Sequence, residues 1–88
     1  FVPTAFTPNG DGMNDQLKPI CVGISKLAYF RVYNRWGQLV FQTTQMNAGW
    51  NGRINGKAQP TGGYVYMAEG TDYNGKTVSR KGTSLLIR

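Results

Sequence analysis

The sequence contains no histidine and only one cysteine, Cys21. Without histidine the chain lacks the side chain that most often acts as a general base or as a metal ligand at neutral pH. Cys21 stands in the apolar context "PICV", which disfavours the reactive thiolate. A structural zinc site and an intrachain disulfide both require further Cys or His residues. We therefore expect a protein that is not an enzyme.

Long apolar runs are also absent. No window approaches the roughly 18 consecutive apolar residues that a membrane-spanning helix requires. No basic and then apolar signal segment opens the chain either, and Phe1 begins directly in a strand-like run. We expect residues 1–88 to form a single domain that has been cut from a longer protein.

Acidic residues are few, and the net charge is +6 from ten Lys and Arg against four Asp and Glu. Such a charge favours acidic partners in general, including nucleic acid, anionic lipid and acidic protein surfaces. The basic residues are scattered without a dense cluster, which is more typical of a solvated surface than of a nucleic-acid site. Polyanion binding stays open as an alternative function, and its affinity would fall steeply with salt.

Period-two alternation dominates the sequence, and no stretch of ten or more residues has helical spacing. Six segments read as strands: "FVPTAF", "QLKPICV", "LAYFRVYN", "QLVFQTT", "YVYMAEGTDY" and "KTVSRKGTSLLIR". Six or seven short strands with turn signals at this spacing predict an all-β fold, a small immunoglobulin-like antiparallel β-sandwich of about seven strands. An open barrel is the alternative. Pro3 places the first segment at a sheet edge.

Two turns connect the central strands. "NRWG" joins residues 27–34 to residues 38–44, with Gly37 expected at a positive φ. "NG" at Asn74-Gly75 predicts the second hairpin. Alternation predicts that Ala28, Phe30, Val32 and Asn34 face the core. The stretch "QMNAGWNGRINGKAQPTGG" is predicted to be irregular because Gly, Asn and Pro fill it.

The opening stretch "TPNGDGMND" is rich in hard oxygen ligands. Asn9, Asp11, Asn14 and Asp15 resemble the alternating short side chains of a calcium loop, although no acidic residue follows at the far end. The alternative is a tight turn in which Asn and Asp cap their own backbone, with Gly10 and Gly12 at positive φ. We expect no cofactor other than this candidate calcium ion.

The two tryptophans, Trp36 and Trp50, suggest carbohydrate or nucleic-acid stacking. Such a surface needs several exposed aromatic side chains on one flat face. Because Trp36 lies in a turn and Trp50 in a glycine-rich loop, we predict instead that both fold back to close the end of the core.

Five blocks together resemble a known family. They are "FTPNGDGMND", "VYNRWGQLVF", "GWNG", "PTGGYVYMAEGTDYNGK" and the terminal "KGTSLLIR". In order and spacing they look like the gliding-motility-associated C-terminal domain, the type B sorting domain of type IX secretion substrates. The resemblance covers nearly the whole chain. It implies an immunoglobulin-like fold and a monomeric module with no transmembrane segment and no nucleic-acid partner.

The resemblance also implies a function. Members end large secreted or cell-surface proteins of Gram-negative bacteria, often adhesins. The cargo reaches the periplasm, and its folded C-terminal domain then directs it through the type IX translocon of the outer membrane. An outer-membrane protein of the PorP/SprF kind is the expected partner. A calcium-dependent adhesion or carbohydrate-binding module is the alternative function.

We predict that the last strand, Thr83–Arg88, is an open sheet edge that a partner extends by strand addition. The predicted docking residues are Lys81, Gly82, Leu85, Leu86, Ile87 and Arg88. The residues predicted to preserve the shape are Gly10, Gly12, Trp36, Gly37, Trp50 and Gly75.

Overall fold

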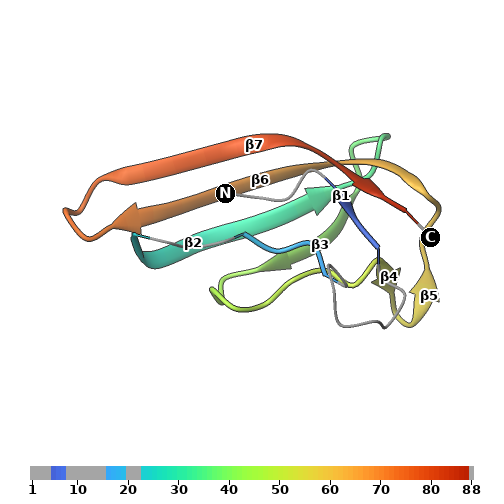
Figure 1. Cartoon of the computed structure of the whole chain (residues 1–88), viewed down its shortest axis with the longest axis horizontal. Coiled ribbons are helices and arrows are strands. Elements are labelled where there is room, and N and C mark those ends of the chain that lie inside the picture. Colours follow the sequence, from blue (N-terminus) through green and yellow to red (C-terminus); the bar gives the residue numbers. More distant parts are fainter. Residues whose placement is uncertain (1–4, 8–15, 20–22, 88) are drawn as a thin grey trace.

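Two long hairpins form the centre of the fold (Figure 1). The computed structural model describes residues 5–7, 16–19 and 23–87. Its strands are β1 (Ala5–Phe6), β2 (Ile24–Tyr33), β3 (Leu39–Thr43), β4 (Arg53–Ile54), β5 (Lys57–Ala58), β6 (Gly62–Asp72) and β7 (Thr77–Leu86). The all-β class and the number of strands are confirmed for the described part of the chain. The strand predicted at "QLKPICV" is wrong over residues 16–19, where Leu17 forms only an isolated bridge with Trp50.

Five strands form one sheet in the order β1-β7-β6-β2-β3, and β4 and β5 form a separate two-stranded sheet. The neighbours β7-β6, β6-β2 and β2-β3 are antiparallel. The strictly antiparallel arrangement is wrong at one pair, because β1 runs parallel to β7 and pairs Ala5 with Leu85 and Phe6 with Leu86. As predicted for the first segment, β1 lies at a sheet edge.

The two hairpin turns have the same hydrogen bonds. At the β2-β3 turn, Asn34 N donates to Gln38 O over 2.9 Å and Gly37 N donates to Asn34 O over 3.0 Å. The β6-β7 turn repeats this pattern, with bonds of 2.9 Å from Asp72 N to Lys76 O and 3.1 Å from Gly75 N to Asp72 O. Gly37 and Gly75 have φ values of 81° and 82°. This conformation is unfavourable for residues that have a Cβ atom, so glycine is preferred at both positions. Both turn predictions are confirmed.

The stretch predicted to be irregular contains a third hairpin, formed by β4 and β5. Asn55 and Gly56 lie between these strands at φ values of 51° and 80°. Two successive positive φ values are those of a type I′ turn, which Asn-Gly favours. The prediction of an irregular stretch is wrong here. The Asn-Gly dipeptide that predicts a hairpin at Asn74-Gly75 also occurs at Asn55-Gly56.

One face of the large sheet, here called the inner face, carries the core. Its buried side chains include Phe30, Val32, Tyr64 and Leu86. Trp50, from the loop before β4, belongs to the same buried cluster. The Trp50 ring lies 4.8 Å from that of Tyr64 and 5.8 Å from that of Phe6, measured between centroids. Backbone bonds of 2.8 and 2.9 Å join Leu17 to Trp50, so a second short segment is tied to this cover.

The predicted core face of β2 is correct at Phe30 and Val32 but wrong at Ala28, which is exposed. The pairing of β2 with β6 shifts register between Leu27 and Tyr29. This bulge reverses the alternation, so Leu27 packs against the core instead. Gly70 permits the close approach, because a Cβ atom there would lie 2.7 Å from Lys26 O.

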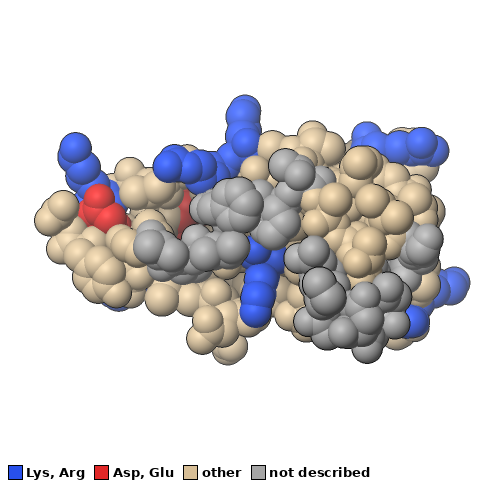
Figure 2. All heavy atoms as spheres, in the orientation of Figure 1, with Lys and Arg blue, Asp and Glu red and all other residues tan. Residues whose placement is uncertain are grey.

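Charge is distributed unevenly over the described residues. Lys and Arg side chains project from both ends and the edges of the visible face, whereas the coloured Asp and Glu side chains gather at the end where β6 turns into β7 (Figure 2). The two acidic residues in the described part of the chain are Glu69 and Asp72, both in the second half of β6. At the opposite end of the sheet, the charged side chains of the described residues are therefore all Lys or Arg.

Candidate functional site

The turn between β2 and β3 holds its two tip residues rigidly. Asn34 Oδ1 accepts hydrogen bonds from Trp36 N over 2.9 Å and from Gln38 N over 3.0 Å. Asn34 Nδ2 donates to Gln38 Oε1 over 2.8 Å. An Asn side chain that binds backbone two residues ahead stabilises a turn of this kind. The main chain that carries Arg35 and Trp36 is thereby fixed.

Trp36 projects into solvent from this turn, with 70% of its surface exposed. The prediction that both tryptophans fold back into the core is confirmed for Trp50, at 1% exposed, and wrong for Trp36. The difference arises because Trp50 Nε1 donates to Arg53 O over 3.0 Å, which satisfies its polar group inside the fold. Trp36 stays exposed, and its ring makes a cation–π contact with its neighbour, with the Arg35 guanidinium carbon 4.3 Å from the ring centroid.

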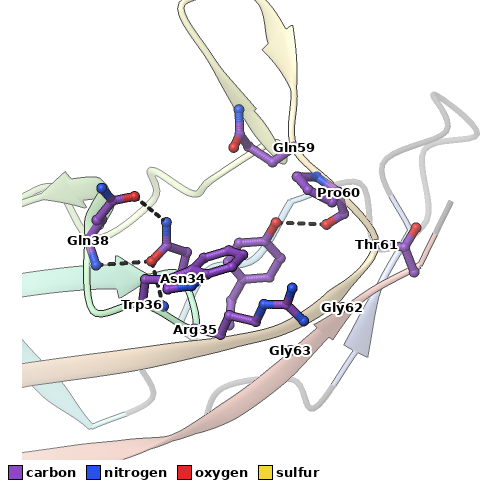
Figure 3. A pocket seen from close by; sticks show the side chains of 10 residues that line it. Asn34, Arg35, Trp36, Gln38, Gln59, Pro60, Thr61, Gly62 and Gly63 are labelled. Carbon is purple, nitrogen blue, oxygen red and sulfur yellow. Dashed lines mark hydrogen bonds between the residues drawn. The ribbon is translucent and has the colours of Figure 1, made fainter.

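A cleft of about 330 Å³ lies between this turn and the segment that enters β6. The turn contributes Asn34, Arg35, Trp36 and Gln38, and the entering segment contributes residues 59–64. Figure 3 shows the two groups facing each other, with Trp36 and Arg35 on one side and Pro60 and Thr61 on the other. Tyr64 Oη donates to Pro60 O over 2.7 Å, which holds the entering segment against the sheet. Two of the motif blocks, "NRWG" and "PTGG", thus meet at one site.

The residues that line this cleft offer groups suited to binding. The residues that line it include no carboxylate, imidazole or thiol. An exposed indole with a guanidinium beside it offers a flat surface for stacking and a donor for an anion.

The predicted docking residues of the last strand divide between the two faces of the sheet. Leu86 is fully buried, and Gly82 lies under the Tyr66 ring, where a Cβ atom would be 2.8 Å from Tyr66 Oη. Lys81, Leu85 and Ile87 are exposed. Leu86 and Gly82 therefore preserve the fold, and Lys81, Leu85 and Ile87 are accessible to a partner. Arg88 lies outside the described residues.

The last strand is not an open edge along its whole length. β1 pairs with Leu85 and Leu86, and Ile87 N donates to Phe6 O over 3.0 Å. The prediction of strand addition at Thr83–Arg88 is therefore wrong over Leu85 to Ile87. Removing the last six residues would also delete buried Ser84 and Leu86. Such a truncation would damage the core as well as any signal.

The face opposite the core, here called the outer face, was missed by the sequence reasoning. Residues directly opposite each other in antiparallel strands share a face. The pairing therefore places Leu39, Tyr33, Val65 and Thr83 in one row across β3, β2, β6 and β7. The adjacent row is Gln42, Arg31, Met67 and Lys81. The signal was present in "YVYM", where both alternating sets are apolar.

The candidate calcium residues, Asn9, Asp11, Asn14 and Asp15, lie outside the described residues, as do Gly10 and Gly12. Within residues 5–7, 16–19 and 23–87, no three Asp, Glu, Cys or His residues cluster as metal ligands. Calcium binding by the opening stretch stays a prediction.

The sequence matches the model of a known protein family. A family model described as the CHU_C Type IX secretion signal domain matches residues 1–86. No curated protein matches the sequence. The described part of the chain forms no helix long and apolar enough to cross a membrane. The matched region contains both segments of the cleft and every strand of the outer face.

Proposed function

Because the chain belongs to the CHU_C type IX secretion signal domain family, we propose that it directs its parent protein through the outer-membrane translocon by docking, as a folded domain, to a translocon-associated protein. The match over residues 1–86 carries this proposal. A type IX secretion signal marks its protein for the cell surface or for secretion from a Gram-negative bacterium. The proposal adds that recognition occurs by docking of the folded sheet.

The structure supports recognition of a folded domain. Phe30, Val32 and Leu86 are fully buried and belong to the same hydrophobic cluster as Trp50, so the strands form a closed core. Lys81 and Leu85 are exposed on β7, where they lie opposite Met67 and Gly63 of β6. A partner that contacts them reads a shape assembled from several strands.

The partner, the route and the cargo belong to the same proposal. An outer-membrane protein of the PorP/SprF kind binds the domain after the parent protein has reached the periplasm. The domain acts as a monomer and carries out no catalysis. The parent protein is a surface protein of the adhesin class.

A reporter fusion tests this function. A fluorescent protein with a general secretory signal is fused ahead of residues 1–88 and expressed in a type IX-competent host and in a translocon-defective one. We expect delivery to the surface or the medium only in the competent host. Equal delivery in both hosts, or periplasmic retention in both, would contradict the proposal.

Carbohydrate binding is the second candidate, and the exposed Trp36 favours it. With Arg35 at 4.3 Å, the indole could stack on a sugar ring at the mouth of the cleft. Trp36→Ala should then abolish binding on a glycan array. Tyr73→Ala, which removes another exposed aromatic side chain at the other hairpin turn, should leave it unchanged. Absence of glycan binding by the unmodified chain would reject this candidate.

A further inference from the structure

The outer face carries exposed apolar side chains at positions where a solvated sheet face is normally polar. Four of the seven large hydrophobic side chains that are exposed in the described residues, Leu39, Val65, Met67 and Leu85, lie on its four strands. Antiparallel sheets that cover one face usually alternate apolar and polar residues along each strand. A contiguous exposed apolar patch on a folded domain marks an interaction surface.

In the two rows of the outer face that contain the apolar residues, every charged side chain is a cation. The row Gln42, Arg31, Met67 and Lys81 places a cation on each side of Met67, and the row Leu39, Tyr33, Val65 and Thr83 has no charge. Neither row contains a carboxylate. Glu69 lies in the next row, opposite Tyr29 and Ser79. The Arg31 side chain is held in place by a cation–π contact, since its guanidinium carbon lies 4.4 Å from the centroid of the Tyr29 ring.

From these rows we propose that the outer face is the docking surface of the domain. Its partner is a protein surface that is apolar opposite Val65 and Leu85 and carries carboxylates opposite Arg31 and Lys81. This inference rests on the proposed function and names the surface that performs it. Apolar contact at the centre with cations beside it gives both affinity and orientation.

A second copy of the chain fits this surface poorly. A two-fold contact between identical faces brings each patch against itself. Arg31 and Lys81 of one copy would then approach the same cations of the other, which is unfavourable across an interface. The charge pattern favours an acidic partner of a different sequence.

A charge-reversal pair tests the surface in the reporter fusion. Lys81→Glu changes a cation on the outer face, whereas Arg80→Glu makes the same change one residue earlier, on the side of the strand shared with Ala68. We expect Lys81→Glu to reduce delivery about tenfold and Arg80→Glu to change it less than about twofold. Melting temperatures of the purified chains check that both variants fold. Lys81→Gln replaces Lys81→Glu if the latter unfolds, with a smaller reduction expected.

The outcomes separate the two proposals. If the unmodified fusion is not delivered, the proposed function fails. If it is delivered and Lys81→Glu behaves like Arg80→Glu, the docking surface is wrong and the function stands.

Crosslinking identifies what covers the face. A photoreactive benzoylphenylalanine at position 65 should form an adduct with an outer-membrane component of the type IX system, and the same residue at position 80 should not. An adduct with a second copy of the chain would overturn the proposal. So would the absence of a protein adduct together with binding to anionic phospholipid vesicles that Lys81→Glu alone removes.

Discussion

The inner and outer faces of the five-stranded sheet are built from the same strands and both carry large apolar side chains, yet they differ in how far those side chains are buried. On the inner face Phe30, Val32 and Leu86 are fully buried in one hydrophobic cluster with Trp50. On the outer face Val65 and Leu85 keep 40% and 49% of their surface exposed among the described residues. Stability is therefore concentrated on one face, and the other is available for recognition.

The largest expected effect is at the cover of the inner face. Trp50→Ala should lower the free energy of unfolding by about 3–5 kcal/mol, because it removes a large buried side chain that contacts Phe6 and Tyr64. Urea denaturation followed by circular dichroism measures the change. Trp36→Ala is the control and should alter stability by less than about 0.5 kcal/mol, since its ring is exposed. Equal losses would contradict the division of roles between the tryptophans.

Adjacent leucines on β7 give the sharpest test of the two faces. Leu86→Ala should lower the free energy of unfolding by about 2–4 kcal/mol, because Leu86 is fully buried. Leu85→Ala should cost about 1 kcal/mol or less, because half of its side chain is already in water. Thermal or urea denaturation of both variants checks the difference. A larger loss of stability for Leu85→Ala than for Leu86→Ala would contradict the assignment of the core to the inner face.

A pair of glycines extends the comparison. Gly82→Ala should destabilise the fold by about 1–2 kcal/mol, because its Cβ atom would lie 2.8 Å from Tyr66 Oη and the ring would have to move. Gly63→Ala should be neutral or slightly stabilising, because its Cβ atom would lie 3.4 Å from Thr83 Cγ2, an ordinary contact. Melting temperatures measure both. Equal shifts would show that the Tyr66 ring yields without cost.

The smallest expected effect is a gain at Ser84. Its side chain is fully buried, and no described residue pairs with its Oγ atom by a hydrogen bond. Ser84→Ala should therefore raise the free energy of unfolding by about 0.5–1 kcal/mol. Ser79→Ala, at an exposed position of the same strand, should leave urea stability unchanged. A loss on Ser84→Ala would mean that the hydroxyl has a partner in the protein.

Local sequence signals predicted the strands and hairpins, because these depend on residues that are close together in the chain. Alternation and the turn dipeptides located β2 with β3 and β6 with β7, because each hairpin is closed by its own turn. The same logic would have found β4 and β5 at Asn55-Gly56. The predicted core face of β2 was wrong at Ala28. A bulge depends on pairing with the partner strand, so the alternation within β2 does not reveal it.

Features that join distant segments were not predictable in this way. The parallel pairing of β1 with β7 brings together residues 80 positions apart, and nothing within either segment specifies it. The cleft likewise depends on the approach of Asn34–Gln38 to residues 59–64. Trp36 and Trp50 both lie in glycine-containing loops, so exposure of one and burial of the other followed only from the tertiary contacts.

Export of a folded outer-face variant tests the central claim most directly. The double variant Val65→Ser with Leu85→Ser removes two exposed apolar side chains and leaves the buried core residues in place. We predict a chain that still unfolds cooperatively and a reporter fusion whose delivery in the type IX-competent host falls to about one tenth or less of the unmodified level. Delivery at the unmodified level by a folded variant would contradict the account.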